Sequence, residues 1–165
     1  MASTRDPRNP KVISHYGLPQ ISQTHLEANS QSFLAGEPVY LNSGAVTESA
    51  EGASRLIWGI ALTDATDVST GNAEIAVEII GPNDELQINV SSDGTLANLE
   101  AADTTCVPGK SYDLVLSSGI WVVDSNDVTN PTVIFVDAIY DAAGSATYMG
   151  RFKLLESVRQ GGEGS

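Results

Sequence analysis

Two runs of alternating side chains on either side of a turn sequence constrain the fold of this chain most strongly. In residues 73–80 apolar side chains alternate with acidic or small ones, and residues 85–90 alternate in the same way. A period of two places the apolar side chains on one face of a β-strand. Gly-Pro-Asn-Asp at 81–84 is typical of a tight turn. We therefore expect residues 73–90 to form a β-hairpin.

Further strand patterns are spread along the chain. They cover residues 37–41, 57–62, 112–116, 120–123, 132–140 and 148–158. Within one of them, Gly59 and Ala61 share a face small enough to lie beneath another backbone or side chain. Only residues 95–103 show helical spacing, and they span barely two turns. The sequence therefore predicts an all-β fold, a small antiparallel barrel or sandwich of about eight strands.

The first 32 residues differ from this pattern. They contain three prolines and few apolar residues, which favours an extended N-terminal arm. A disordered leader is the alternative, but the apolar pairs in 12–13 and 16–18 favour an arm that becomes ordered against a partner. We expect an arm at 1–32, a β body at 33–158 and a flexible, glycine-rich tail at 159–165.

The charge of the chain is concentrated in the expected body. The whole chain holds 21 Asp and Glu against 8 Lys and Arg, a formal charge of −13. Residues 31–150 contribute −15, and the segments 1–30 and 151–165 contribute +1 each. An acidic body argues against binding to nucleic acid or to anionic lipid, both of which need clustered basic residues. We also expect no membrane span and no cleaved signal peptide, because no sufficiently long apolar run is present.

Residues for catalysis or metal binding are sparse. The histidines, His15 and His25, lie in the expected arm, and Cys106 has the sequence surroundings of a small buried residue. We therefore predict no enzyme activity, no metal site and no cofactor, although a glycosidase-like carboxylate pair stays an alternative in so acidic a chain. The acids in 64–67 and 124–127 offer oxygens suited to calcium, but Asp and Asn also cap turns, and both interpretations stay open.

Four segments resemble the head decoration (cement) proteins of tailed phages. They are Gly-Lys-Ser-Tyr-Asp-Leu at 109–114, Gly-Ile-Trp-Val-Val-Asp at 119–124, Gly-Arg-Phe-Lys-Leu-Leu at 150–155, and Asn-Asp-Glu-Leu-Gln-Ile at 83–88. The resemblance extends over roughly residues 33–158. It implies a β-barrel or sandwich without catalytic residues.

The resemblance also implies a function. Such a protein binds the outer surface of the icosahedral head, bridges neighbouring capsomers and stabilises the shell against the pressure of packed DNA. Its partners would be the major capsid protein and two further copies of itself in a homotrimer. It would be made in the host cytoplasm and reside on the virion. The alternative is another virion component, of the tail or a fibre, or a carbohydrate-binding adhesin module.

Two sets of candidate binding residues follow. The expected arm supplies candidate capsid contacts, which are Arg5, Arg8, Lys11, Val12, Ile13, Tyr16 and Leu18. Strands that are apolar on both faces supply candidate oligomer contacts, which are Trp121, Val123, Ile134, Val136 and Tyr140. A core closed within one chain is the alternative explanation of the second set.

Overall fold

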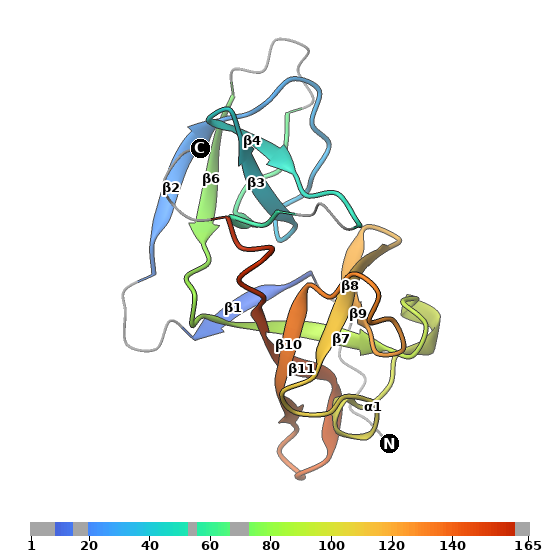
Figure 1. Ribbon diagram of the computed structural model, residues 1–165. Coiled ribbons are helices and arrows are strands. Elements are labelled where there is room, and N and C mark those ends of the chain that lie inside the picture. The colour runs from blue at the N-terminus through green and yellow to red at the C-terminus, as the bar shows by residue number, and fades with distance from the viewer. Residues whose placement is uncertain (1–8, 15–19, 53–55, 67–72, 161–165) are drawn as a thin grey trace.

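The chain folds into two β lobes, one above the other in Figure 1. The computed structural model describes residues 9–14, 20–52, 56–66 and 73–160. Within this part, eleven strands form a six-stranded sheet of order β1-β7-β11-β10-β8-β9 and a five-stranded sheet of order β2-β6-β5-β3-β4. The predicted all-β class is confirmed.

The strand bounds are β1 Lys11–Ser14, β2 Ser22–Leu26, β3 Pro38–Asn42, β4 Ala45–Glu48, β5 Gly59–Ala61, β6 Glu74–Ile79, β7 Glu85–Ser91, β8 Ser111–Ser117, β9 Ile120–Asp124, β10 Val133–Tyr140 and β11 Ala146–Leu154. The eight predicted strands correspond to β3 and β5–β11, and the additional ones are β1, β2 and β4.

The predicted hairpin over residues 73–90 is wrong. β6 pairs with β5 and β2, whereas β7 pairs with β1, β11 and β9, so the two strands belong to different lobes. Residues 81–84 do form a turn, in which the carboxylate of Asp84 accepts a hydrogen bond from the amide of Gly81 at 2.7 Å. This turn carries the chain from one lobe to the other. The hairpin prediction failed because alternation identifies the buried face of a strand but not the strand with which it pairs.

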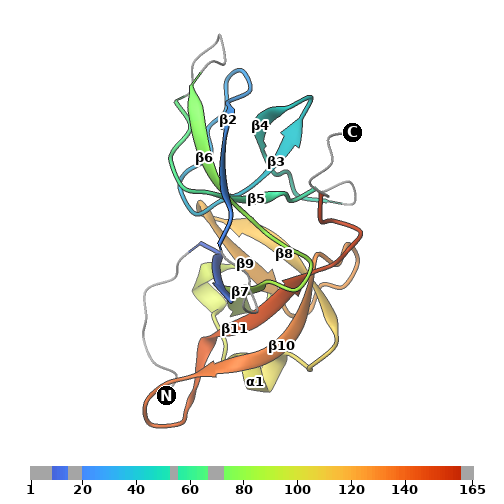
Figure 2. The same cartoon turned by 90° about the vertical axis from the view of Figure 1, so that its left-hand side faces the viewer.

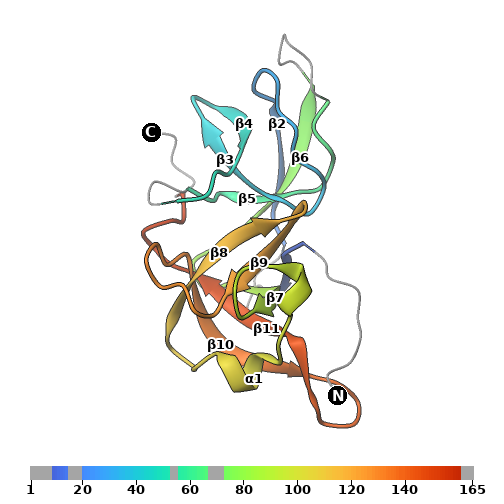
Figure 3. The same ribbon diagram turned by 90° about the vertical axis from the view of Figure 1, so that its right-hand side faces the viewer.

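The six-stranded lobe is a closed barrel with one extra strand. Strands β7, β11, β10, β8 and β9 form a ring that is closed by a parallel pairing of β7 with β9. β1 pairs with the first half of β7. Instead of the predicted helix over 95–103, a 3-10 turn (Leu96–Asn98) and the short α1 (Ala102–Thr105) follow β7, and α1 contacts β10 and β11 (Figure 3).

The five-stranded lobe has a separate core, formed by Phe33, Val39, Val46, Trp58, Ala61, Ile75 and Val77. The sheet is curved, so that Glu27, the residue after β2, forms a bridge with Val46 of β4. There the amide of Ala28 donates a hydrogen bond to the carbonyl of Val46 at 2.9 Å. The predicted small face of β5 is confirmed. A Cβ on Gly59 would lie 2.3 Å from the carbonyl oxygen of Glu78 in β6.

The described parts of the expected arm are strands of the body. β1 lies in the six-stranded lobe, β2 in the five-stranded lobe, and both are on the same side of the molecule (Figure 2). The domain boundary expected at residue 32 therefore does not separate them from the body. At the other end of the chain, Gln160 is also held, because its side chain accepts a hydrogen bond from the amide of Leu41 at 2.7 Å.

Candidate functional site

Three of the candidate capsid-binding residues are on β1. Lys11 and Ile13 point outward, and Ile13 is 38% exposed. Val12 is 6% exposed and belongs to the core of the six-stranded lobe, so its assignment as a capsid contact is wrong. The other four candidates, Arg5, Arg8, Tyr16 and Leu18, lie outside the described residues.

Strand β2 adds two exposed apolar residues that the sequence analysis did not select. Ile21, just before the strand, is 53% exposed, and Leu26 at its end is 49% exposed. The described residues from 9 to 14 and from 20 to 26 include no acid and one base, Lys11. We call these exposed residues, Lys11, Ile13, Ile21 and Leu26, the N-terminal face; strand alternation directs Ile21 and Leu26 to opposite faces of their sheet, so the name refers to their place in the chain. The four residues carry one positive charge and no negative one, on a strongly acidic protein.

The candidate oligomer contacts divide into two groups. Trp121 and Val123 are 3% and 0% exposed and lie in the barrel core, so they are not available to another subunit. Their strand is also paired on both edges, with β7 and β8. On β10, Ile134 and Val136 are half-buried, and Tyr140 is 50% exposed.

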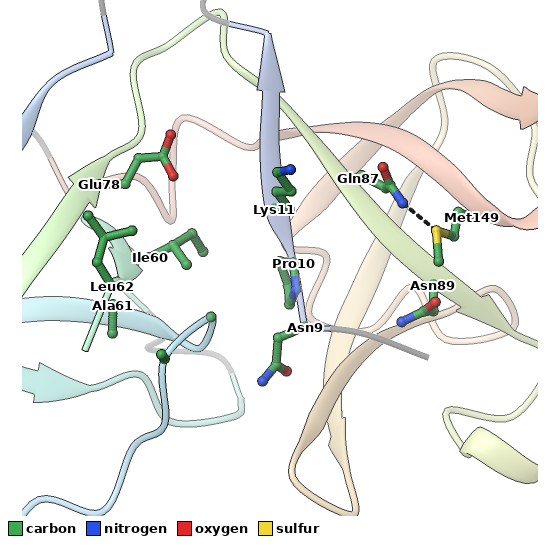
Figure 4. A pocket seen from close by; sticks show the side chains of 12 residues that line it. Asn9, Pro10, Lys11, Ile60, Ala61, Leu62, Glu78, Gln87, Asn89 and Met149 are labelled. Atoms are coloured by element: carbon green, nitrogen blue, oxygen red, sulfur yellow. Dashed lines mark hydrogen bonds between the residues drawn. The ribbon is translucent and has the colours of Figure 1, made fainter. Parts of the chain in front are cut away.

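A groove of about 560 Å³ lies between the lobes (Figure 4). β1 forms its centre, with Ile60, Leu62 and Glu78 on one side and Gln87, Asn89 and Met149 on the other. The size is within the range of small-ligand sites.

Hydrogen bonds already occupy several polar side chains of this groove. The side-chain oxygen of Asn9 accepts a hydrogen bond from the amide of Trp121 at 2.9 Å, and the side-chain amide of Gln87 donates to the sulfur of Met149. These contacts hold β1 and β11 in place, which gives the polar side chains a structural role. Asn89, the first residue of an Asn-Val-Ser glycosylation sequon, is 2% exposed and inaccessible to such modification.

A smaller groove of about 270 Å³ is acidic. It is lined by Glu37, Glu48 and Glu51, together with Leu116 and Trp121. Burial raises the pKa of Glu37, and the nearby charge of Glu48 adds to the effect. Each carboxylate accepts a backbone hydrogen bond, from Leu34, Ser32 and Leu116 respectively, so the acids hold loops in place.

Other buried acids have similar structural roles. Glu27, 1% exposed, accepts hydrogen bonds from the amide and hydroxyl of Thr66, the latter at 2.7 Å. Glu85, 2% exposed, lies 3.3 Å from Arg151, whose guanidinium also contacts Asp137 at 3.1 Å. The sequence pattern placed Glu85 on an outward face, but the structure buries it beside Arg151.

The candidate calcium loop at 124–127 caps its own backbone. One oxygen of Asp124 accepts hydrogen bonds from the amides of Asn126 and Asp127, and Asp127 accepts one from Thr129 at 2.7 Å. That last hydrogen bond lowers the pKa of Asp127. Among the described residues, no group of three His, Cys, Asp or Glu side chains is placed to hold a metal ion. The second candidate loop includes Asp67, which lies outside the described residues.

The described nucleophile and base candidates, Cys106 and His25, have structural surroundings. Cys106 is buried, and desolvation raises the pKa of its thiol to about 11, which keeps it protonated at neutral pH. His25 packs edge-on against Trp58 with ring centroids 5.0 Å apart. His15 lies outside the described residues. Of the helices in the described part of the chain, none has the length and apolar character needed to span a membrane.

Comparison with known proteins adds no relative. No model of a known protein family matches the chain, and no curated protein matches it. The geometry described above therefore carries the functional argument.

Proposed function

We propose that this chain is a structural protein that decorates the outer surface of a tailed-phage head and stabilises the shell. The resemblance of its C-terminal strand segments to head decoration proteins supports this proposal. The observation that carries it is the N-terminal face. Its exposed apolar side chains belong to β1, to β2 and to the residue before β2, and the two strands lie on the same side of a protein with a net charge of −13.

The charge distribution supports binding through this face. Long-range repulsion opposes contact between an acidic protein and other acidic surfaces. The described residues 9–14 and 20–26 contain no acid of their own, so these strands add no like-charge repulsion themselves, although the exposed Glu74 of β6 lies beside Leu26. Burying Ile13, Ile21 and Leu26, which are between 38% and 53% exposed, supplies an apolar contribution to binding.

The proposal includes self-association. Decoration proteins of the resembled group commonly form trimers, and the outer apolar side chains of β10 are the available contacts for such an assembly. These are Ile134, Val136 and Tyr140. Light scattering measures the mass in solution, and a mass of one 17.3 kDa chain would argue against a trimer in the absence of the shell.

The capsid experiment uses point variants. Deleting residues 1–32 would remove two strands and the buried Val12 and Glu27, so loss of binding would only report loss of folding. Purified protein is instead added to phage heads that lack it, and occupancy is measured by cosedimentation and electron microscopy. We expect full decoration by the natural protein and at least a tenfold weaker binding of Ile21→Asp.

The matched control is Val128→Asp, because Val128 is 49% exposed and lies on a loop away from β1 and β2. We expect this variant to decorate heads like the natural protein. Full occupancy by Ile21→Asp would contradict binding through the N-terminal face. Absence of the natural protein from heads, or density on the tail, would contradict head decoration itself.

A further inference from the structure

Strand β2 is an edge strand without the usual protection against pairing with another chain. Natural edge strands are interrupted by charges, prolines or bulges. β2 contains none of these, since Ser22–Leu26 reads Ser-Gln-Thr-His-Leu and pairs with β6 in five consecutive positions without a register shift. In the described part of the chain, β2 stands at the end of its sheet.

The hydrogen-bond pattern shows which backbone groups of β2 point outward. The carbonyl of Ile21 accepts from the amide of Ile79 at 2.9 Å, and the amide of Glu27 donates to the carbonyl of Ala73 at 2.8 Å. Antiparallel strands form such pairs at every second residue. The amides and carbonyls of Ser22 and Thr24 therefore point away from β6.

β4 lies close to β2, and its backbone pairs with the residue that follows the strand. The bridge joins Glu27 to Val46, and further along the side chain of Gln31 accepts a hydrogen bond from the amide of Glu48 at 2.8 Å. In the described part of the chain, no strand pairs with this edge from Ser22 to Thr24, a stretch of about 10 Å.

Glu74 defines the kind of chain that fits this edge. It is paired with Leu26, is exposed, and shares the outer face of the sheet with Thr24 and Leu26. A strand added beside β2 would lie about 10 Å from β6, within reach of a long basic side chain extended toward Glu74. A second copy of this chain is a poor occupant because pairing β2 with itself would bring two acidic bodies together.

We propose that the free edge of β2 accepts an extended, basic segment of the shell protein as an additional β-strand, an inference that rests on the proposed head-decorating function. Backbone hydrogen bonds from Ser22 and Thr24 provide the affinity, and Glu74 selects Lys or Arg on the outer face. The N-terminal face then buries its apolar side chains against the same partner.

The test compares Thr24→Pro with Thr24→Val in the full chain. Proline removes only an amide that points away from β6, and edge strands tolerate it, whereas valine keeps the amide and the β-branched shape. We expect Thr24→Pro to bind heads about tenfold or more weakly and Thr24→Val to bind within about threefold of the natural protein. Glu74→Lys is expected to weaken binding and to reduce its dependence on salt.

The outcomes separate the two proposals. If the natural protein does not bind heads, head decoration fails. If it binds and Thr24→Pro binds equally well, strand addition at β2 is refuted while head decoration stands. Hydrogen exchange of the unaltered protein gives a reading independent of the folding of any variant. Peptides covering residues 20–27 should exchange at least about tenfold more slowly on heads, and unchanged exchange would also overturn the inference.

Discussion

Truncating Val12 tests whether β1 is a structural strand or the outer arm that the sequence indicated. Val12 is 6% exposed and packs in the core of the six-stranded lobe. Val12→Ala removes the equivalent of two buried CH₂ groups at about 0.8 kcal/mol each, and the remaining cavity adds to this cost. We expect a loss of about 2 kcal/mol in the free energy of unfolding, or about 4–8 °C in Tm for a chain of this length.

The matched control is Val107→Ala. Val107 is 58% exposed, so the same chemical change removes less than half as much buried surface and leaves no cavity, with an expected cost of about 0.6 kcal/mol. Urea unfolding at neutral pH is followed by the fluorescence of Trp121, which shares the core of Val12, in a Trp58→Phe background. If Val12→Ala and Val107→Ala differ by less than about 0.5 kcal/mol, β1 does not pack as described.

Three further variants test other features of the fold by urea unfolding or titration. Gly59→Ala should destabilise the protein by about 3 kcal/mol or more, because its Cβ would lie 2.3 Å from a β6 carbonyl oxygen; an unchanged midpoint would refute this close approach. Ser118→Asn should stabilise by about 0.5 kcal/mol, since Ser118 has φ +51° in a two-residue hairpin turn where Asn is favoured, and a loss of stability would contradict that turn. Hydrogen bonds, first from Thr95 and then from Asn98, lower the pKa of Asp93 from 3.8 to about 2. The ionised Asp93 therefore contributes to the stability of the folded protein above pH 3.8, and this contribution is lost as the pH falls toward 2. Thr95→Val should raise that pKa in an NMR titration, and an unchanged value would show that the hydroxyl is not its cause.

The sequence predicted strands well where apolar residues alternate with polar ones. It did not predict which strands pair with one another. Eight strands were predicted because their patterns are strong, whereas β1, β2 and β4 are four or five residues long with little apolar pattern. The strands flanking the turn at 81–84 were placed in one hairpin, since alternation identifies a buried face without identifying its partner. Only the tertiary structure shows that this turn connects two lobes.

The candidate site was predictable in part. The sequence pointed to residues 11–13 as a binding segment, and two of the three are exposed. Val12 could not be separated from them, because a four-residue strand carries too short a pattern. Trp121 and Val123 were assigned to a subunit contact because their strand is apolar on both faces, a pattern that closure of the barrel equally produces. The position of β2 at the edge of its sheet depends on which strands pair with one another. The amino-acid composition of β2 does not reveal this position.

The way Gln160 and Arg159 contact the five-stranded lobe has a consequence for how the protein folds. Gln160 hydrogen-bonds to Leu41 across 119 residues of sequence, and Arg159 bridges to Ile57. The strands of that lobe are all synthesised before β7. The hydrogen bonds of Gln160 to Leu41 form only after the last barrel strand, β11, has been synthesised. Contacts of such long range slow folding, because loop closure precedes the stabilisation they bring. In a chain whose last residues are not yet made, the backbone of Leu41 lacks this contact, and the high negative charge opposes association between such chains.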